Sequence, residues 1–520
     1  MNSRASFGKL DVDAVASLSQ SSAAAEPDMP FRIGIFGDFS GRASRGVCQP
    51  ESLAGRRLHS VDRDNFEELL ARLQVGLSLP MPGGQALPLD FREMDDFHPD
   101  RIYEQVEAFA ALRQLRRKLH NPQTFAEAAA EVRGWYKARA ASAPAPSAPQ
   151  PAKETPSQPT PEGLFDQVLD EAQHRFAERP ENARRSTQSQ WDVLIADLVE
   201  PYLLPKTDPK QAEYVASVDA AVGELMRQIL HHPQFQALEA SWQALNLLVS
   251  RLETDADLKL FVWDVSKAEL ETDLTANEDL SQSGTYRLLV EQSVHVPEGK
   301  PWSLFVGDYC FGPTRSDAEL LGRLAKIVQA AGAPLVAGAD ARLVGCPSLF
   351  RTPDPLDWQF VPEKDAVQAW ASLRALPEAE WIGLAMPRFL LRFPYGRKTN
   401  PMEKFDFDEL PGEPDHEGYL WGNPAFACAC LLGQAFSRQG WNFRPGMINE
   451  IDDLPVHVYQ SEGESEMKPC AEVLLTDRAA EAIAARGLIP LRSVQNQGAV
   501  RVEEYLSIAA SAARLRGRWS

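Results

Sequence analysis

The chain has 520 residues, of which 44% are hydrophobic and 24% are charged, and its formal net charge at pH 7 is −20. A chain of this length is too long for one ordinary core and predicts two or three folded domains. The acidic excess opposes binding to a phosphate backbone and excludes nucleic acid as an expected partner. The first thirty residues lack the apolar segment of a secretory signal, and no later run approaches the roughly 20 apolar residues of a membrane helix. We therefore expect a cytoplasmic globular protein with no direct membrane insertion.

A proline-rich segment divides the chain. Residues 143 to 161 read APAPSAPQPAKETPSQPTP, with seven prolines and no apolar periodicity. This composition favours an extended, polyproline-like linker over a packed core. We therefore expect five parts in order: a disordered tail over 1–29, a first module over 30–138, a linker over 139–162, a second module over 163–500 and a helical tail over 501–520.

The first module is predicted to be a small α/β domain. Residues 31–36 form an apolar run that predicts a strand, and residues 85–91 predict a second one. Apolar residues recur at helical spacing over 64–73 and again over 102–119, which predicts two amphipathic helices.

The second module begins with two predicted helices. The first runs over 211–232 and is stopped by Pro233, which denies it a further turn. In the second, Phe235, Leu238 and Trp242 begin an apolar stripe that continues to Leu252 at steps of three and four residues.

Strands and helices then alternate, which predicts an α/β sheet. A strand over 258–265 precedes a capping box, Ser266 to Glu269, and a second capping box is expected at Ser316 to Glu319 before a helix that stops at Gly332. Further strands are predicted by the apolar runs at residues 303–306, 334–337, 381–384, 455–459 and 472–475. The fold class is α/β, with two modules joined by the linker.

Two strands end in the same motif. Phe36-Gly-Asp-Phe39 and Val306-Gly-Asp-Tyr309 both close an apolar run with glycine, aspartate and an aromatic residue. We interpret the echo as coincidence rather than internal duplication. Asp38 and Asp308 are nevertheless candidate interaction residues at the two turns.

No pattern in the chain predicts catalysis, a metal or a cofactor. His231 and His232 are adjacent and point about 100° apart on a helix, so they cannot converge on one ion, and we expect a structural role at a helix end. Cys428 and Cys430 lie in an apolar run that reads as a buried helix face, and the six cysteines of the chain suggest no disulfide framework. The segment Gly396 to Thr399 only approximates a phosphate loop. The chain is not expected to be an enzyme.

A basic and aromatic run, PRFLLRFPYGRK over 387–398, contains Arg388, Arg392 and Arg397. In a strongly acidic chain we expect these arginines to meet an acidic surface of a partner subunit. Together with the aromatic stripe at Phe235, Leu238 and Trp242, they are the predicted contact residues.

Several long blocks resemble the two sheath proteins of the type VI secretion system. HHPQFQALEASWQAL, VGDYCFGP, PRFLLRFPYGRKTNP and GYLWGNPAFACA, between residues 231 and 429, are similar to the large sheath subunit (TssC/VipB/ImpC type). PFRIGIFGDFSG, VDRDNFEELL and REMDDFHPD, between residues 30 and 100, are similar to the small one (TssB/VipA/ImpB type). The chain thus resembles a fusion of two proteins that are normally separate.

The resemblance implies a structural role in a contractile sheath. In that family, protomers stack in helical rings around an inner tube, contraction drives the tube outward, and a AAA+ ATPase recycles the subunits. Other sheath subunits are the implied partners, with the inner tube protein, baseplate proteins and the ATPase as further ones. The linker would hold the two halves at roughly millimolar effective concentration and fix their stoichiometry.

Two alternatives stay open at this stage. Family large subunits continue into strands that pair with neighbouring protomers, and this chain ends soon after Leu491. An accessory sheath-like protein that acts as a cap, a baseplate adaptor or an assembly regulator without polymerising is therefore the second hypothesis. A ligand-binding or enzymatic α/β protein that uses the Gly-Asp turns is the third.

Overall fold

The computed structural model describes residues 5–10, 28–81, 86–130, 132, 211–294, 299–412, 414–461, 463–511 and 513–519. The expected linker over 139–162 lies outside the described residues. The chain divides into two compact units: the first comprises residues 1–79, 86–105 and 226–520, and the second comprises 80–85 and 106–225. The first unit therefore combines residues from both expected modules.

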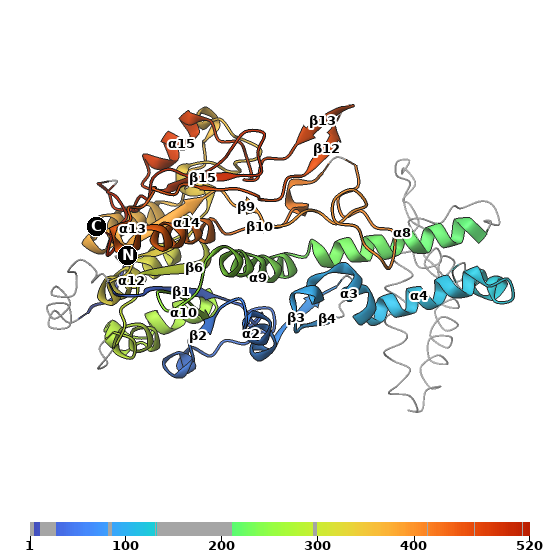
Figure 1. Cartoon of the computed structure of the whole chain (residues 1–520), viewed down its shortest axis with the longest axis horizontal. Coiled ribbons are helices and arrows are strands. Elements are labelled where there is room, and N and C mark those ends of the chain that lie inside the picture. The colour runs from blue at the N-terminus through green and yellow to red at the C-terminus, as the bar shows by residue number, and fades with distance from the viewer. Residues whose placement is uncertain are drawn as a thin grey trace, which may run out of the picture. The chain divides into compact units, whose positions relative to one another are not determined.

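A nine-stranded mixed sheet forms the centre of the first unit (Figure 1). Its order is β11-β15-β14-β8-β7-β6-β1-β5-β2, and the six strands from β14 to β5 run parallel. The strands are β1 (Phe31–Gly37), β2 (His59–Val61), β5 (Leu258–Asp264), β6 (Leu304–Phe311), β7 (Leu335–Ala339), β8 (Ile382–Met386), β11 (Glu450–Ile451), β14 (Ile489–Ser493) and β15 (Val500–Val502). This confirms the α/β class.

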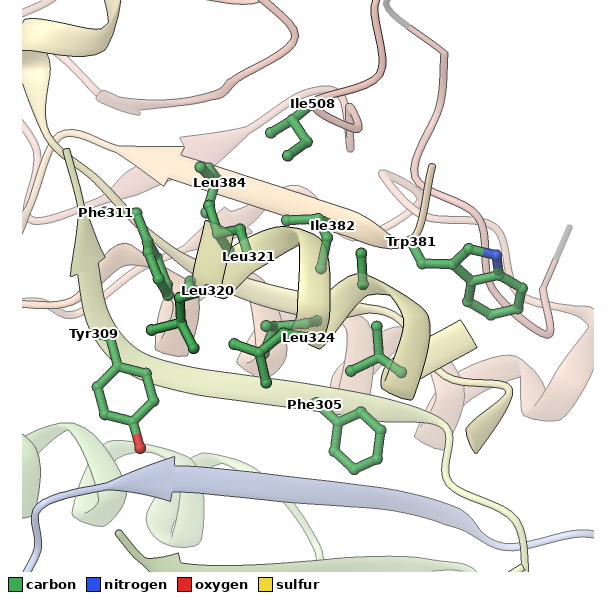
Figure 2. Packing of buried hydrophobic residues seen from close by; sticks show 14 of the residues in the cluster. Phe305, Tyr309, Phe311, Leu320, Leu321, Leu324, Trp381, Ile382, Leu384 and Ile508 are labelled. Atoms are coloured by element: carbon green, nitrogen blue, oxygen red, sulfur yellow. The ribbon is translucent and has the colours of Figure 1, made fainter. Parts of the chain in front are cut away.

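Helices cover the sheet, because its parallel strands are apolar on both faces. Leu320, Leu321 and Leu324 of α12 (Arg315–Ala331) join Phe305 and Ile382 in one buried hydrophobic cluster, as Figure 2 shows. Strand residues alternate in direction, so Val306 and Val336 point to the opposite face. There α14 (Pro424–Gln439) packs on β6, β7 and β8, and α9 (Pro233–Arg251) packs on α14.

Shorter elements complete the first unit. Two-stranded sheets pair β3 (Val75–Pro80) with β4 (Ala86–Phe91), β9 (Phe389–Leu390) with β10 (Trp421–Gly422), and β12 (Val458–Ser461) with β13 (Glu464–Met467). Among its described residues the unit also contains the α-helices α2 (Phe66–Leu73), α3 (Pro99–Gln105), α10 (Lys267–Thr275), α11 (Gly284–Tyr286), α13 (Lys364–Arg374) and α15 (Asp477–Ala484).

The second unit contains α4 (Glu107–His120) and the greater part of α8 (Gln211–Leu230). The two helices are joined by an ion pair between Arg116 Nε and Asp219 Oδ1 at 2.5 Å, and Gln211 donates a hydrogen bond to the carbonyl oxygen of Leu119 at 2.6 Å. Among the helices of the described residues, none combines the length and the apolarity needed to cross a membrane.

Most predicted elements are confirmed, including the Ser266 to Glu269 capping box and the stop of α12 at Gly332, whose φ is 71°. Three local predictions are wrong. The helix expected over 102–119 is broken at Val106, which is buried in extended backbone. The second capping box is not formed, because Thr314 caps α12 instead. Residues 472–475 form no strand.

The predicted C-terminal helix is also wrong. The described residues after Val502 form turns and an isolated antiparallel bridge between Leu506 and Arg514. Tyr505, Ile508 and Leu515 are buried in the first unit. Their burial outweighs the helical spacing of the segment, because tertiary packing overrides local propensity.

The start of the chain is ordered where the structure describes it. Lys9 pairs with Asp279 in a parallel bridge, and the Lys9 amide donates to the carbonyl oxygen of Glu278 at 2.6 Å. Phe7 packs on Gly322 of α12 so closely that a Cβ atom there would lie 2.2 Å from its ring. Residues 5–10, expected to belong to a disordered tail, therefore dock on the second module.

Candidate functional site at the junction of the two modules

Strand β1 of the first module lies between two strands of the second. It pairs with β5 along its whole length, from Phe31 opposite Leu258 to Gly37 opposite Asp264, and with β6 from Ile33 opposite Leu304 to Phe36 opposite Gly307. Each edge of β1 thus bonds to a strand more than 200 residues away in sequence. The first module completes the sheet of the second and does not form a separate sheet around β1.

Close packing on the apolar face holds β1 in place. The side of Gly34 is filled by the ring of Phe305, which would lie 2.8 Å from a Cβ atom at that position. Phe36 packs against Trp263 of β5 and Phe305 of β6 at ring-centroid distances of 5.3 and 5.1 Å. Aromatic pairs at such distances add to the stabilisation from burial.

The two Gly-Asp motifs meet at the carboxyl end of the sheet, since β1 and β6 are parallel neighbours. Asp38 accepts hydrogen bonds from the amides of Arg42 and Ala43 at 2.6 and 2.8 Å and so shapes the turn after β1. Asp308 accepts a hydrogen bond from the Ser241 hydroxyl at 2.5 Å and so links β6 to α9. Both candidate residues therefore make structural contacts within the chain.

Burial raises the pKa of Asp308 to about 6, and the nearby charge of Asp38 acts in the same direction. The described residues contain no group of three histidine, cysteine, aspartate or glutamate side chains placed to hold a metal ion. The arrangement therefore offers hydrogen bonds between elements rather than a cation site.

The aromatic stripe of α9 is core and not a contact surface. Phe235 and Trp242 are fully buried, and Leu238 is 3% exposed. The indole nitrogen of Trp242 donates to the carbonyl oxygen of Phe39 at 2.8 Å, and its ring lies 5.6 Å from that of Phe39. The stripe thus packs against the first module, and its prediction as a surface for a partner subunit is wrong because no side chain of the three reaches solvent.

A buried glutamate of the second module binds two arginines of the first. Glu269 is fully buried in its side chain and lies 2.9 Å from Arg42 and 3.0 Å from Arg56. Although burial alone would raise it, hydrogen bonds from Arg56 and Arg42 lower the pKa of Glu269 to about 2. The same carboxylate closes the capping box of α10, so one side chain fixes a helix start and the junction together.

The three arginines of the basic run are all paired within the chain. Arg392 is almost fully buried and bonds to Glu239 at 2.6 Å and to Glu409 at 2.8 Å. Burial alone would raise the pKa of Glu409, but the positive charge of Arg392 lowers this pKa to about 2. Arg392 is therefore unable to reach a partner subunit, contrary to the prediction.

Arg388 and Arg397 lie nearer the surface. Arg388 pairs with Glu472 at 2.6 Å and Arg397 pairs with Asp406, and their side chains are 45% and 78% exposed. The prediction that they meet an acidic surface of another subunit remains a prediction, and both already have acidic neighbours on their own chain.

His232 and the two free cysteines of α14 have structural roles. α8 ends at Leu230, and His232 caps the start of α9 by accepting a hydrogen bond from the Gln234 amide. His231 Nε2 lies 3.6 Å from Glu409. Cys428 and Cys430 are buried within α14, as predicted.

Sequence reasoning did not identify Glu269 as part of the junction, nor Glu239 and Glu409 as the buried partners of Arg392 within the second module. Glu239 carried a signal, because it stands on the apolar stripe of α9 four residues after Phe235, where a charged side chain must find a partner. The partner of Glu239 is Arg392, which lies 153 residues away in the sequence, and no local pattern predicts that pairing.

Comparison with known proteins agrees with this two-part architecture. Residues 212–507 match the family model of the EvpB/VC_A0108 tail sheath N-terminal domain, and residues 15–134 match that of type VI secretion system VipA. The type VI secretion system sheath protein TssC1 of Pseudomonas aeruginosa is 33% identical over 329 residues, which cover 62% of this chain and 66% of that protein. The sheath protein TssB1 of the same organism is 27% identical over 104 residues, which cover 19% and 58% respectively.

A mixed sheet shared between two halves defines a two-part structural protein whose parts are matched by two different sheath families. The chain belongs to the type VI secretion system tail sheath family, in its large-subunit branch over 212–507, with a small-subunit module fused before it. It spans just under two thirds of the length of TssC1 and somewhat over half of that of TssB1.

Proposed function

We propose that this protein is a structural component of a type VI secretion contractile sheath, in which one chain supplies both halves of the protomer. The observation that carries the proposal is the position of β1 between β5 and β6, because it makes the two halves parts of one sheet. The buried contacts of Trp242 with Phe39 and of Glu269 with Arg42 and Arg56 support the same conclusion.

The proposed partners are other sheath subunits in the bacterial cytoplasm, followed by the inner tube protein, baseplate proteins and a AAA+ recycling ATPase. The role is mechanical and uses no catalytic residue. Fusion replaces a bimolecular step by an intramolecular one at roughly millimolar effective concentration, so each protomer receives one copy of each half.

Electron microscopy of the purified chain tests the proposal. The chain is tagged, produced alone and with separate small and large sheath subunits, and imaged in negative stain. Striated tubes with the tag along their length are the expected result. Discrete particles confined to tube ends would contradict it and favour an accessory cap or adaptor.

A further inference from the structure

A groove of about 370 Å³ lies on the first unit, away from the junction. Its walls come from the segment between Arg342 and Pro362, from α13, and from the chain around Leu488 and Ile508. Phe360, Trp370 and Ile508 give it an apolar lining. The volume falls in the range of about 300 to 1,000 Å³ typical of binding pockets.

Exposed apolar side chains continue beyond the groove. Val361 and Val367 line it and are 81% and 49% exposed, and Leu356, five residues before Val361, is 73% exposed. Apolar side chains that gather on a surface, rather than occurring singly, mark sites where another molecule binds. Val361 and Val367 line the groove and yet stay exposed, so a small molecule enclosed in it would leave apolar surface in water, and we expect a larger occupant.

Two arginines at the groove have no acidic partner. Among the described residues, no carboxylate lies within 4.0 Å of the charged groups of Arg374 and Arg486, whereas Arg342 on the same groove pairs with Asp340 at 2.6 Å. Arg374 uses its Nε to donate to the carbonyl oxygen of Ile508 at 2.9 Å, which fixes its position. Burial lowers the pKa of Arg374, and the charge of Arg486 lowers it further, so the two cations repel each other.

We propose that this groove is a docking site for a segment of a partner protein in which one or two large apolar side chains are flanked by carboxylates. The apolar walls receive the side chains, and Arg374 and Arg486 receive the carboxylates. Arginine suits this role, because its planar head binds carboxylates in bidentate fashion. The argument uses only the groove and does not depend on the proposed sheath function.

Peptide selection tests the proposal without knowledge of the partner. A library of random 12-residue peptides displayed on phage is selected on the immobilised full chain, and enriched peptides are titrated by fluorescence anisotropy. We expect enriched peptides to place aspartate or glutamate beside leucine, phenylalanine or tryptophan. Their affinity should fall about tenfold in Arg486→Gln, the effect of losing one charge pair of ordinary strength.

Matched variants make the result specific. Arg397→Gln removes another exposed arginine, which is already paired with Asp406, and it should leave affinity unchanged. Val367→Asp places a negative charge in the apolar wall of the groove and should abolish peptide binding. Circular dichroism checks that this variant is folded. Replacing the acidic residues of the peptide by glutamine should reduce affinity as Arg486→Gln does.

Three results would overturn the proposal. One is enrichment of peptides without acidic residues, or no enrichment at all. Another is equal affinity for the chain and for Arg486→Gln. The third is self-association of the chain in sedimentation velocity that Arg486→Gln and Val367→Asp abolish, since the occupant would then be a second copy of the same chain.

Discussion

Trp242 shows how one side chain joins the two halves of the molecule. Its ring packs on Phe39 and Phe66 of the first module, and its nitrogen reaches the backbone of Phe39. Truncation would remove these contacts, leave a cavity and orphan the Phe39 carbonyl oxygen.

We expect Trp242→Ala to lower the free energy of unfolding by about 3 to 5 kcal/mol, the usual cost of removing a large buried aromatic side chain. Urea denaturation followed by circular dichroism measures it. Arg397→Ala, at a largely exposed position, should change stability by less than about 0.5 kcal/mol. A loss of partner binding at unchanged stability would show that the ring acts at an interface and not in the core.

Asp308 makes stability depend on pH in a particular direction. Its pKa is raised by burial to about 6 from an ordinary value of 3.8. Between these values the folded state binds the proton and the unfolded state does not, so the contribution of Asp308 to stability is greatest at low pH and is lost as pH rises through 6.

In Asp308→Asn this dependence should disappear. The stability of the wild-type chain relative to the variant should fall by about 2 kcal/mol between pH 4 and pH 7, a value reduced from the full shift because the side chain is partly exposed. Urea denaturation at several pH values checks the difference. Asp452→Asn, at a side chain that is 85% exposed, is the control and should show no such trend. A parallel pH profile in wild-type and variant chains would contradict the expectation.

At the scale of elements, β1 is the strand on which the junction depends. It forms hydrogen bonds on both edges, and Ile33 and Ile35 are fully buried. A charge placed at either isoleucine would be buried inside the sheet.

Ile35→Asp should therefore detach β1 and destabilise the first unit by more than about 4 kcal/mol, because the buried carboxylate has no cation beside it. Hydrogen exchange should show loss of protection in β1, β5 and β6 together. Arg63→Asp, in the surface turn before α2, serves as the control and should retain protection. Exchange limited to β1 alone would show that β5 and β6 close up without it.

For the whole molecule, we predict that the segment 139–162, expected to be a linker, is dispensable once the chain has folded, because described contacts join the two modules. A protease site inserted in the segment 139–162 allows the linker to be cut in the native protein. We expect both fragments to elute together in gel filtration. The shared sheet and the buried ion pairs of Glu269 with Arg42 and Arg56 should keep them associated.

The same cut in Ile35→Asp should release the first module. Retention of the fragments in both proteins would show that contacts other than β1 carry the association. Separation in both would show that the covalent tether, and not the sheet, keeps the halves together.

The amino-acid sequence by itself determined most of the local structure and the family. An apolar run located β1, apolar periodicity located α9, a serine and a glutamate three residues apart predicted the start of α10, and Gly332 ended α12. These features depend on neighbours within a few residues, which the sequence displays directly. The long blocks that resemble the sheath subunits likewise needed no coordinates.

Only the tertiary structure decided how the halves fit together. β1 joins β5 and β6, and Trp242 packs as core against Phe39, across more than 200 positions of the sequence. Within the second module, Arg392 meets Glu239 across 153 positions. Backbone hydrogen bonds between strands do not depend on the side chains, so the sequence of one strand does not identify its partner. An arginine can pair with any carboxylate, and only the fold determines which one lies within reach. The C-terminal segment does not form the predicted helix, because contacts with distant parts of the chain bury its apolar side chains better than a local helix would.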